Sequence, residues 1–212
     1  SFVLGLFSIY YINEKKWLKV IVSMIFIIWG GKRIVLLSVA LSIILYAFIL
    51  LKNKIKKNDI RAVFGTLIIS IFSYIYALRN WIINSFLQQY EIIDYGRLSM
   101  YKMFEEDYYF SFGFVGQGLG YILNKLDNIS IGILNLHSDW LHIYITIGLL
   151  GVFIYIYMYY RVIIKMYKKR KLVSTAIMVL FYTFFLYFTD NTAIYIIYLY
   201  PFNLILYKQI RE

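Results

Sequence analysis

Three residues in this chain stand in settings that suit work on a phosphate ester. Arg33 follows two glycines, Arg97 follows Gly96, and His137 stands just before an apolar run. A guanidinium group is always charged and binds phosphate with paired hydrogen bonds, whereas an imidazole exchanges a proton near neutral pH. Together these residues predict a site that binds a phosphate-bearing ligand and transfers one proton.

Each of these residues also has a structural interpretation. Arg33 could extend to lipid headgroups, and Arg97 could pair with an acidic neighbour at the surface. His142 falls inside the apolar run, where a buried imidazole bonded to a neighbouring helix is favoured. His137, Asp139 and His142 do not share one face of a helix, and a third strong ligand is missing, so no metal site is predicted.

Four glycines precede the histidine, at positions 113, 116, 118 and 120. Their spacing places the third glycine of a G-x-G-x-x-G motif one residue early, and no strand precedes it, which argues against a dinucleotide site. A loop that needs positive φ angles or a close helix approach explains them structurally. Functionally, the backbone at Gly116 and Gly118 could approach the oxygens of a substrate.

Composition indicates the medium in which these residues work. The chain is 62% hydrophobic with a mean hydropathy of +0.69, whereas soluble domains are about 45–50% apolar. This indicates an integral membrane protein. With no cysteine, disulfides, thiolate metal sites and cysteine nucleophiles are excluded. The chain opens at Ser1 within an apolar run and lacks a signal-peptide pattern, so we expect the C-terminal part of a longer protein.

The apolar runs predict a fold that is all-α, a polytopic transmembrane bundle forming a single domain over residues 1–212. A helix needs ~20 apolar residues to cross the hydrocarbon layer. Turns at 30–33 and 189–192 make two tight helical hairpins. The predicted spans are residues 1–12, 16–31, 33–51, 62–80, 140–160, 172–189 and 191–208.

Basic residues predict the orientation, because Lys and Arg are retained on the cytoplasmic side. Most of the 22 basic residues fall in alternate connections or at the end of the chain, and most of the 11 acids fall on the other face. The net charge of +11 is therefore mainly a topology signal, and no nucleic-acid partner is predicted. The membrane lipid itself is the expected neighbour of the basic loops.

Residues 81–139 then form one long extracytoplasmic loop. Its many aromatic residues make it too apolar to be disordered in water, so we expect it to fold back onto the membrane surface. The spacing over 83–93 and 98–104 predicts two short interfacial helices. Long loops held by rigid elements often carry function, and this one contains Arg97, both central glycines and His137.

The order of these short motifs resembles the C-terminal half of the O-antigen polymerase and O-antigen ligase superfamily over roughly residues 20–155. The motifs are Gly30-Gly31-Lys32-Arg33, Gly96-Arg97, Gly116-Gln117-Gly118-Leu119-Gly120, His137-Ser138-Asp139-Trp140-Leu141 and Gly148-Leu149-Leu150-Gly151. The resemblance implies a bacterial integral-membrane glycosyltransferase. In it Arg33, Arg97 and His137 would surround the diphosphate of an undecaprenyl-linked sugar donor. Lys32 stands where serine is frequent, and Ser138 where asparagine is frequent.

The resemblance further implies a polymerase of lipid-linked oligosaccharide repeat units that makes capsular polysaccharide, exopolysaccharide or O-antigen in the plasma membrane. Arg33 and Arg97 would bind the diphosphate, with Gly116, Gly118 and Asp139 beside the substrate and His137 as the base. No cofactor and no metal is expected. A chain-length regulator and a flippase are the expected protein partners. A ligase acting on a finished glycan, a membrane transporter and a structural membrane subunit remain alternatives.

Overall fold

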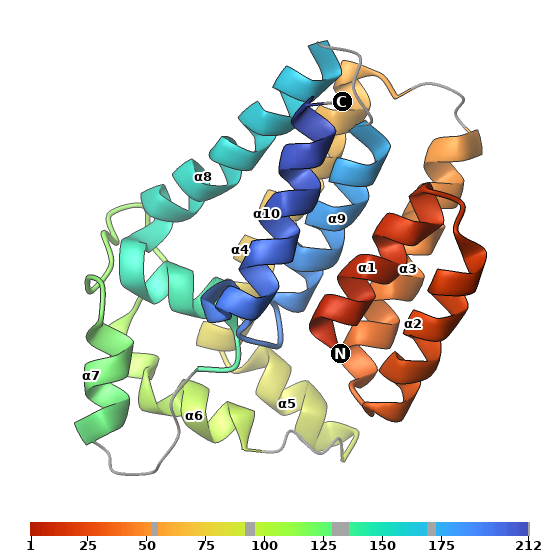
Figure 1. Cartoon of the computed structure of the whole chain (residues 1–212). Coiled ribbons are helices and arrows are strands. Elements are labelled where there is room, and N and C mark those ends of the chain that lie inside the picture. The colour runs from red at the N-terminus through yellow and green to blue at the C-terminus, as the bar shows by residue number, and fades with distance from the viewer. Residues whose placement is uncertain (52–54, 92–95, 129–135, 169–172, 212) are drawn as a thin grey trace. The chain divides into compact units, whose positions relative to one another are not determined.

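The structure is a computed structural model, and it describes residues 1–51, 55–91, 96–128, 136–168 and 173–211. Within these ranges the chain forms helices joined by turns and loops, without strands (Figure 1). Among the described residues, three helices are long and apolar enough to cross a membrane: α3 Arg33–Leu51, α4 Lys57–Arg79 and α8 Asp139–Lys168. The predictions of an all-helical fold and of membrane-spanning candidates are therefore confirmed.

Four shorter helices cover the remaining predicted spans: α1 Phe2–Asn13, α2 Trp17–Trp29, α9 Val173–Leu186 and α10 Ile196–Arg211. Some boundaries differ from the prediction. The predicted 191–208 span starts later, because residues 192–194 form the short 3₁₀ helix η2. Conversely, α4 and α8 extend beyond 62–80 and 140–160 into charged residues, since residues that lipid rejects can still continue a helix in water.

The chain divides into two compact units. Unit 1 comprises residues 1–63 and 159–212, and unit 2 comprises residues 64–158. Unit 1 therefore holds most of the predicted spans, whereas unit 2 holds the aromatic connection and the helix segments on either side of it.

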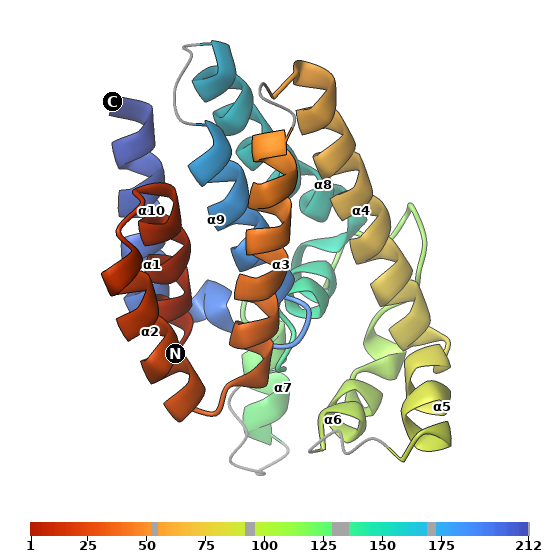
Figure 2. The same ribbon diagram turned by 90° about the vertical axis from the view of Figure 1, so that its right-hand side faces the viewer.

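In unit 1, helix α9 contributes most of the core, because nearly every residue from Val173 to Leu186 is buried. α9 packs against α3 and α1, as Figures 1 and 2 both show. Gly5 of α1 leaves room for the Tyr182 ring, whose hydroxyl donates to the carbonyl of Phe2 at 2.8 Å. The close approach of two apolar helices is thus completed by one satisfied polar group.

Polar contacts at the ends of unit 1 agree with the predicted hairpins. At one end Lys32 lies 3.9 Å from Asp190, so the turns at 30–33 and 189–192 meet. At the other end Ser174 donates to the Asn13 side chain at 3.4 Å, and Lys208 donates to the hydroxyl of Tyr10. The predicted basic connection after α1 and the basic C-terminal segment therefore share one end of this unit.

Unit 2 folds the predicted aromatic connection into short helices. These are α5 Ile82–Gln89, α6 Arg97–Met103, the 3₁₀ helix η1 Glu105–Asp107 and α7 Tyr121–Asn128. The first two match the helices predicted over 83–93 and 98–104, although positions 92 and 93 lie outside the described residues. The sequence did not predict α7.

Helix α8 is interrupted at Gly148, whose φ of 69° and ψ of −174° are not helical. The loop before α7 fills the interruption. The N–H groups of Gln117 and Gly118 donate to the carbonyls of Ile145 and Thr146 at 2.7 and 3.0 Å, and the N–H of Leu149 donates to Phe114 at 3.1 Å. Groups that the interruption frees are thereby paired again, as buried backbone requires.

Two glycines make this contact possible. Gly116 also has a positive φ of 88°, and a Cβ atom there would lie 2.5 Å from the carbonyl oxygen of Thr146. A Cβ atom on Gly148 would overlap the backbone of Phe114 and Val115 in the same way. The two main chains touch directly, so neither position accepts a side chain without movement.

We expect Gly148→Ala to destabilise unit 2 by roughly 3 kcal/mol, from left-handed strain and overlap with backbone that cannot rotate away. Gly65→Ala is the control, because Gly65 lies in α4 with open space around it, and alanine there favours the helix by about 0.5–1 kcal/mol. The measurement is the thermal unfolding midpoint in detergent, followed by circular dichroism. Equal midpoints for the two variants would contradict this role of Gly148.

Candidate functional site

The start of α8 in unit 2 is surrounded by hydroxyl groups and one guanidinium. The Tyr74 hydroxyl of α4 donates to Ser138 Oγ at 3.2 Å, and the Tyr101 hydroxyl of α6 donates to the His137 carbonyl at 3.0 Å. The Tyr74 and Tyr101 side chains are also hydrogen-bonded, and the charge of Arg97 acts on Tyr74. Helices α4 and α6 therefore both contact the segment that contains His137 and Ser138.

His137 has a left-handed backbone, with φ of 50°. Non-glycine residues adopt this region at a cost and cluster at functional sites, and histidine is among the types that tolerate it best. The Tyr101 hydrogen bond to its carbonyl holds the strained residue in place. The imidazole of His137 is half-buried, so it keeps access to a ligand.

Ser138, buried next to His137, caps α8. Its Oγ accepts a hydrogen bond from the N–H of Leu141 at 3.3 Å, which is the usual contact of an N-cap serine with the third helical residue. Because Oγ also bonds Tyr74, the cap is tied to α4. Serine is among the residue types that cap helices best.

Asp139, predicted beside the substrate, is the first residue of α8 and is 1% exposed. A carboxylate in the first helical turn is stabilised by the positive end of the helix dipole. Gly116 and Gly118 lie in the loop that fills the α8 interruption, and the Gly118 N–H is already used by Thr146. Asp139 is thus part of the helix start that follows His137, and Gly116 and Gly118 contact the same helix at Thr146 and Gly148.

Arg97 and Arg33 lie in different units. Arg97 begins α6 in unit 2, is half-buried, and follows Gly96 with its φ of 80°. Arg33 begins α3 in unit 1 and is exposed beside Lys32. Arg97 is close enough to Tyr74 for its charge to act on that hydroxyl, and a shared site with His137 and Arg33 stays a prediction of the sequence.

Sequence reasoning missed Tyr74 and Tyr101. The chain has 23 tyrosines, and Tyr74 stands inside an apolar span where an aromatic residue is unremarkable. Only its hydrogen bond to Ser138, 64 positions away, distinguishes it from the others. The spacing along the chain contains no signal for such a contact.

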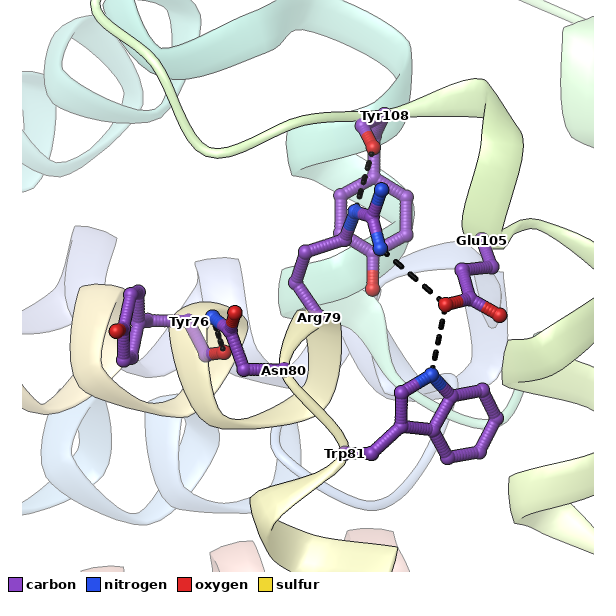
Figure 3. A network of polar contacts seen from close by, with 6 residues as sticks. All are labelled: Tyr76, Arg79, Asn80, Trp81, Glu105 and Tyr108. Carbon is purple, nitrogen blue, oxygen red and sulfur yellow. Dashed lines mark hydrogen bonds and ion pairs between the residues drawn. The ribbon is translucent and has the colours of Figure 1, made fainter.

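A second polar network fixes the end of α4 (Figure 3). Glu105 Oε1 lies 3.3 Å from Arg79 Nη1 and accepts a hydrogen bond from Trp81 Nε1 at 2.7 Å, while Arg79 Nε donates to the carbonyl of Tyr108 at 3.1 Å. Burial raises the pKa of the Tyr108 hydroxyl, so it stays neutral and Glu105 is the anion that balances Arg79. Arg79 at the end of α4 is therefore held by Glu105 and by the carbonyl of Tyr108.

Asp107 organises the neighbouring segment. Its carboxylate accepts hydrogen bonds from the Tyr121 hydroxyl at 2.7 Å and from Lys125 at 2.5 Å, and its backbone carbonyl accepts one from the Gln117 side chain at 2.6 Å. The bond to Asp107 raises the pKa of Tyr121, which keeps that hydroxyl protonated as a donor. Asp107 therefore links η1, the loop of residues 113–120 that contains four glycines (the glycine loop) and α7.

Comparisons with protein families, with curated proteins and with solved structures find no match for the chain. The resemblance to O-antigen polymerases and ligases therefore stays a prediction from the order of short motifs. Within the described ranges, no group of three His, Asp or Glu side chains is placed to hold a metal ion. The geometry of the described residues is accordingly the basis for the functional argument.

We expect Asp107→Ala to destabilise unit 2 by about 2–3 kcal/mol, because Tyr121 and Lys125 lose a mostly buried charged acceptor. Trypsin should also cleave after Lys125 faster, since α7 is no longer held. Glu106→Ala removes an exposed carboxylate one position away and should change stability by less than about 0.5 kcal/mol. Unfolding midpoints and digestion rates compare the two, and matching behaviour would refute the role of Asp107.

Proposed function

We propose that the chain is a polytopic glycosyltransferase of the bacterial plasma membrane that polymerises undecaprenyl-diphosphate-linked oligosaccharide repeat units. The observation that carries the proposal is the cluster in unit 2, where the Tyr74 and Tyr101 hydroxyls bond the His137–Ser138 segment and the charge of Arg97 acts on Tyr74. A fixed cation and a titratable ring are what transfer from a diphosphate-linked donor needs. The three helices long enough to cross a membrane also support it.

In the proposed reaction, an acceptor hydroxyl attacks the anomeric carbon of the donor sugar. The new glycosidic C–O bond forms as the bond to the diphosphate breaks, and undecaprenyl diphosphate leaves with the electron pair. Arg97 stabilises the negative charge that grows on the leaving diphosphate, and His137 accepts the proton of the acceptor hydroxyl. Since a diphosphate leaves readily when neutralised by guanidinium, the scheme needs neither nucleotide nor metal.

Tyr101 and Tyr74 act in this scheme as positioning residues. Tyr101 holds the carbonyl of His137, and Tyr74 holds Ser138 at the cap of α8. Their hydroxyls keep the strained backbone of His137 in one conformation, which is how an orienting group sharpens a general base. The close contact between Gly116 of the loop before α7 and Gly148 of α8 fixes the helix behind the His137 segment.

In this proposal the active site faces the extracytoplasmic side, because the basic connections mark the cytoplasmic side. A flippase would deliver the lipid-linked substrate to that side, and a chain-length regulator would act beside the polymerase. A ligase that transfers finished glycan to another acceptor would use the same donor chemistry. The identity of the acceptor distinguishes the two enzymes.

The interruption of α8 favours a second candidate, a transporter, since broken helices often form substrate sites in transporters. In this protein the carbonyls of Ile145 and Thr146, which could otherwise coordinate an ion, accept hydrogen bonds from the glycine loop. The interruption is therefore filled by the protein's own backbone. This favours the enzyme over the transporter.

We expect Arg97→Ala and His137→Ala each to abolish polymer while the protein is still inserted in the membrane. Arg97→Lys should restore part of the activity, because a lysine keeps the charge but loses the paired hydrogen bonds. Arg61→Ala, at an exposed arginine of α4, is the matched control and should leave polymer unchanged. Polymer length on a gel is the measurement, and full-length polymer from both alanine variants would sink the proposal.

The proposed topology predicts which positions reagents can reach. The chain has no cysteine, so a single introduced thiol reports its own location. Gln89→Cys should react with a membrane-impermeant maleimide on intact spheroplasts, whereas Lys57→Cys and Lys165→Cys should react only after permeabilisation. All three positions are exposed, so folding does not hide them. Labelling of Lys57→Cys on intact spheroplasts would reverse the proposed orientation.

A further inference from the structure

Helices α5 and α6 of unit 2 line a cleft of about 390 Å³ that shares Trp81 with the network of Figure 3. α5 and the residues beside it contribute Trp81, Asn84, Gln88 and Glu91. α6 contributes Ser99 and Lys102, and one leucine from each helix completes the lining. Its volume falls within the range of about 300–1,000 Å³ that is usual for pockets that bind small molecules.

The chemistry of the lining selects a class of ligand. Asn84 and Gln88 each offer both a donor and an acceptor, and Ser99 adds a hydroxyl. Trp81 and the leucines supply apolar surface between these groups. A sugar presents the same alternation, with hydroxyls at its rim and C–H groups on its faces, so the lining suits a saccharide better than a hydrocarbon chain.

The charges of the lining also favour a neutral ligand. Glu91 and Lys102 are its two charged residues among those described, and their formal charges cancel. A polyanion would meet the Glu91 carboxylate, and a cation would meet the Lys102 ammonium. An uncharged sugar meets neither penalty. Its hydroxyls can donate a hydrogen bond to Glu91 and accept one from Lys102.

The Trp81 side chain, which forms one side of the cleft, is held in position by protein contacts alone. Its indole N–H is bound to Glu105 at 2.7 Å, and the Lys102 ammonium lies 5.6 Å from the centre of its ring. Figure 3 shows the indole turned toward Glu105, the residue that also pairs with Arg79. A ligand therefore binds a preformed surface and loses less affinity to ordering.

One wall of the cleft belongs to the helix that begins with the residue to which the proposal assigns the diphosphate. Arg97 is the first residue of α6, and Leu98, Ser99 and Lys102 of the same helix line the cleft. Positions two apart on a helix point to different faces, so Arg97 shares this short helix with the cleft without being part of its lining. We propose that the cleft between α5 and α6 binds neutral sugar units of the glycan that the enzyme extends.

This inference rests on the proposed function, and a binding experiment separates the two. The intact protein in lipid nanodiscs is mixed with short glycan fragments released by mild acid from the envelope polysaccharide of the source cells. The fragments are divided into a neutral and an anionic pool, and neither pool carries a diphosphate. Saturation-transfer NMR then measures binding of each pool.

We expect the neutral pool to bind the wild-type protein and the Asn84→Ala/Gln88→Ala variant to bind it about tenfold more weakly. Gln89→Ala, beside Gln88 but outside the lining, should bind like the wild type. Gln88→Ala alone covers the case in which the double variant does not fold, because Gln88 is exposed, and it should bind severalfold more weakly. Wild-type protein that binds only the anionic pool, or neither pool, would overturn the inference, as would unchanged binding by Gln88→Ala.

Arg97→Ala distinguishes this outcome from failure of the proposed function. It should bind the neutral pool normally, because the fragments lack the diphosphate, while making no polymer. If Arg97→Ala makes full polymer but Gln88→Ala loses glycan binding, the reaction assignment fails and the glycan cleft stands. If Arg97→Ala makes none but Gln88→Ala binds normally, the cleft assignment fails and the reaction stands.

Discussion

The contact between the glycine loop and the interrupted helix α8 is the constraint on which unit 2 depends. A backbone interruption inside an apolar helix leaves polar groups that lipid cannot satisfy. The loop residues Gln117 and Gly118 pair with the carbonyls that the interruption exposes, and this works only because Gly116 and Gly148 lack side chains. The conformation of the loop and that of the helix therefore depend on each other. The part of α8 before Gly148 need not continue in the direction of the part after it.

The same contact links the cluster around His137 to the rest of unit 2. The start of α8 is capped by Ser138 and tied to α4 and α6 by two tyrosine hydroxyls. Asp107 and Glu105 then attach the segments on either side of the glycine loop. The carboxylates of Glu105 and Asp107 hold neighbouring segments together by hydrogen bonds. This gives acids in so aromatic a connection a structural role.

Much of the helix content follows from the sequence because lipid selects long apolar runs. The hairpin turns at 30–33 and 189–192 were predictable for the same reason, since polar residues interrupt those runs. The short helices α5 and α6 were predictable from their spacing, whereas α7 was not. Half of its eight residues are polar, and it is held mainly through Asp107, a contact that periodicity does not reveal.

Within the candidate site, residue type and position along the chain marked Arg97 and His137, because a guanidinium can bind phosphate, an imidazole can move a proton, and both lie in the connection that contains the glycines. Residue type could not mark Tyr74, Tyr101 or the cleft lined by Asn84 and Gln88. Those depend on which helices meet, and contacts such as that of Tyr74 with Ser138 join residues far apart in the chain. The sequence by itself determined an apolar helical protein with two notable ionisable residues in its longest connection. Only the tertiary structure decided which hydroxyls surround them, because side-chain hydrogen bonds form between faces that packing brings together.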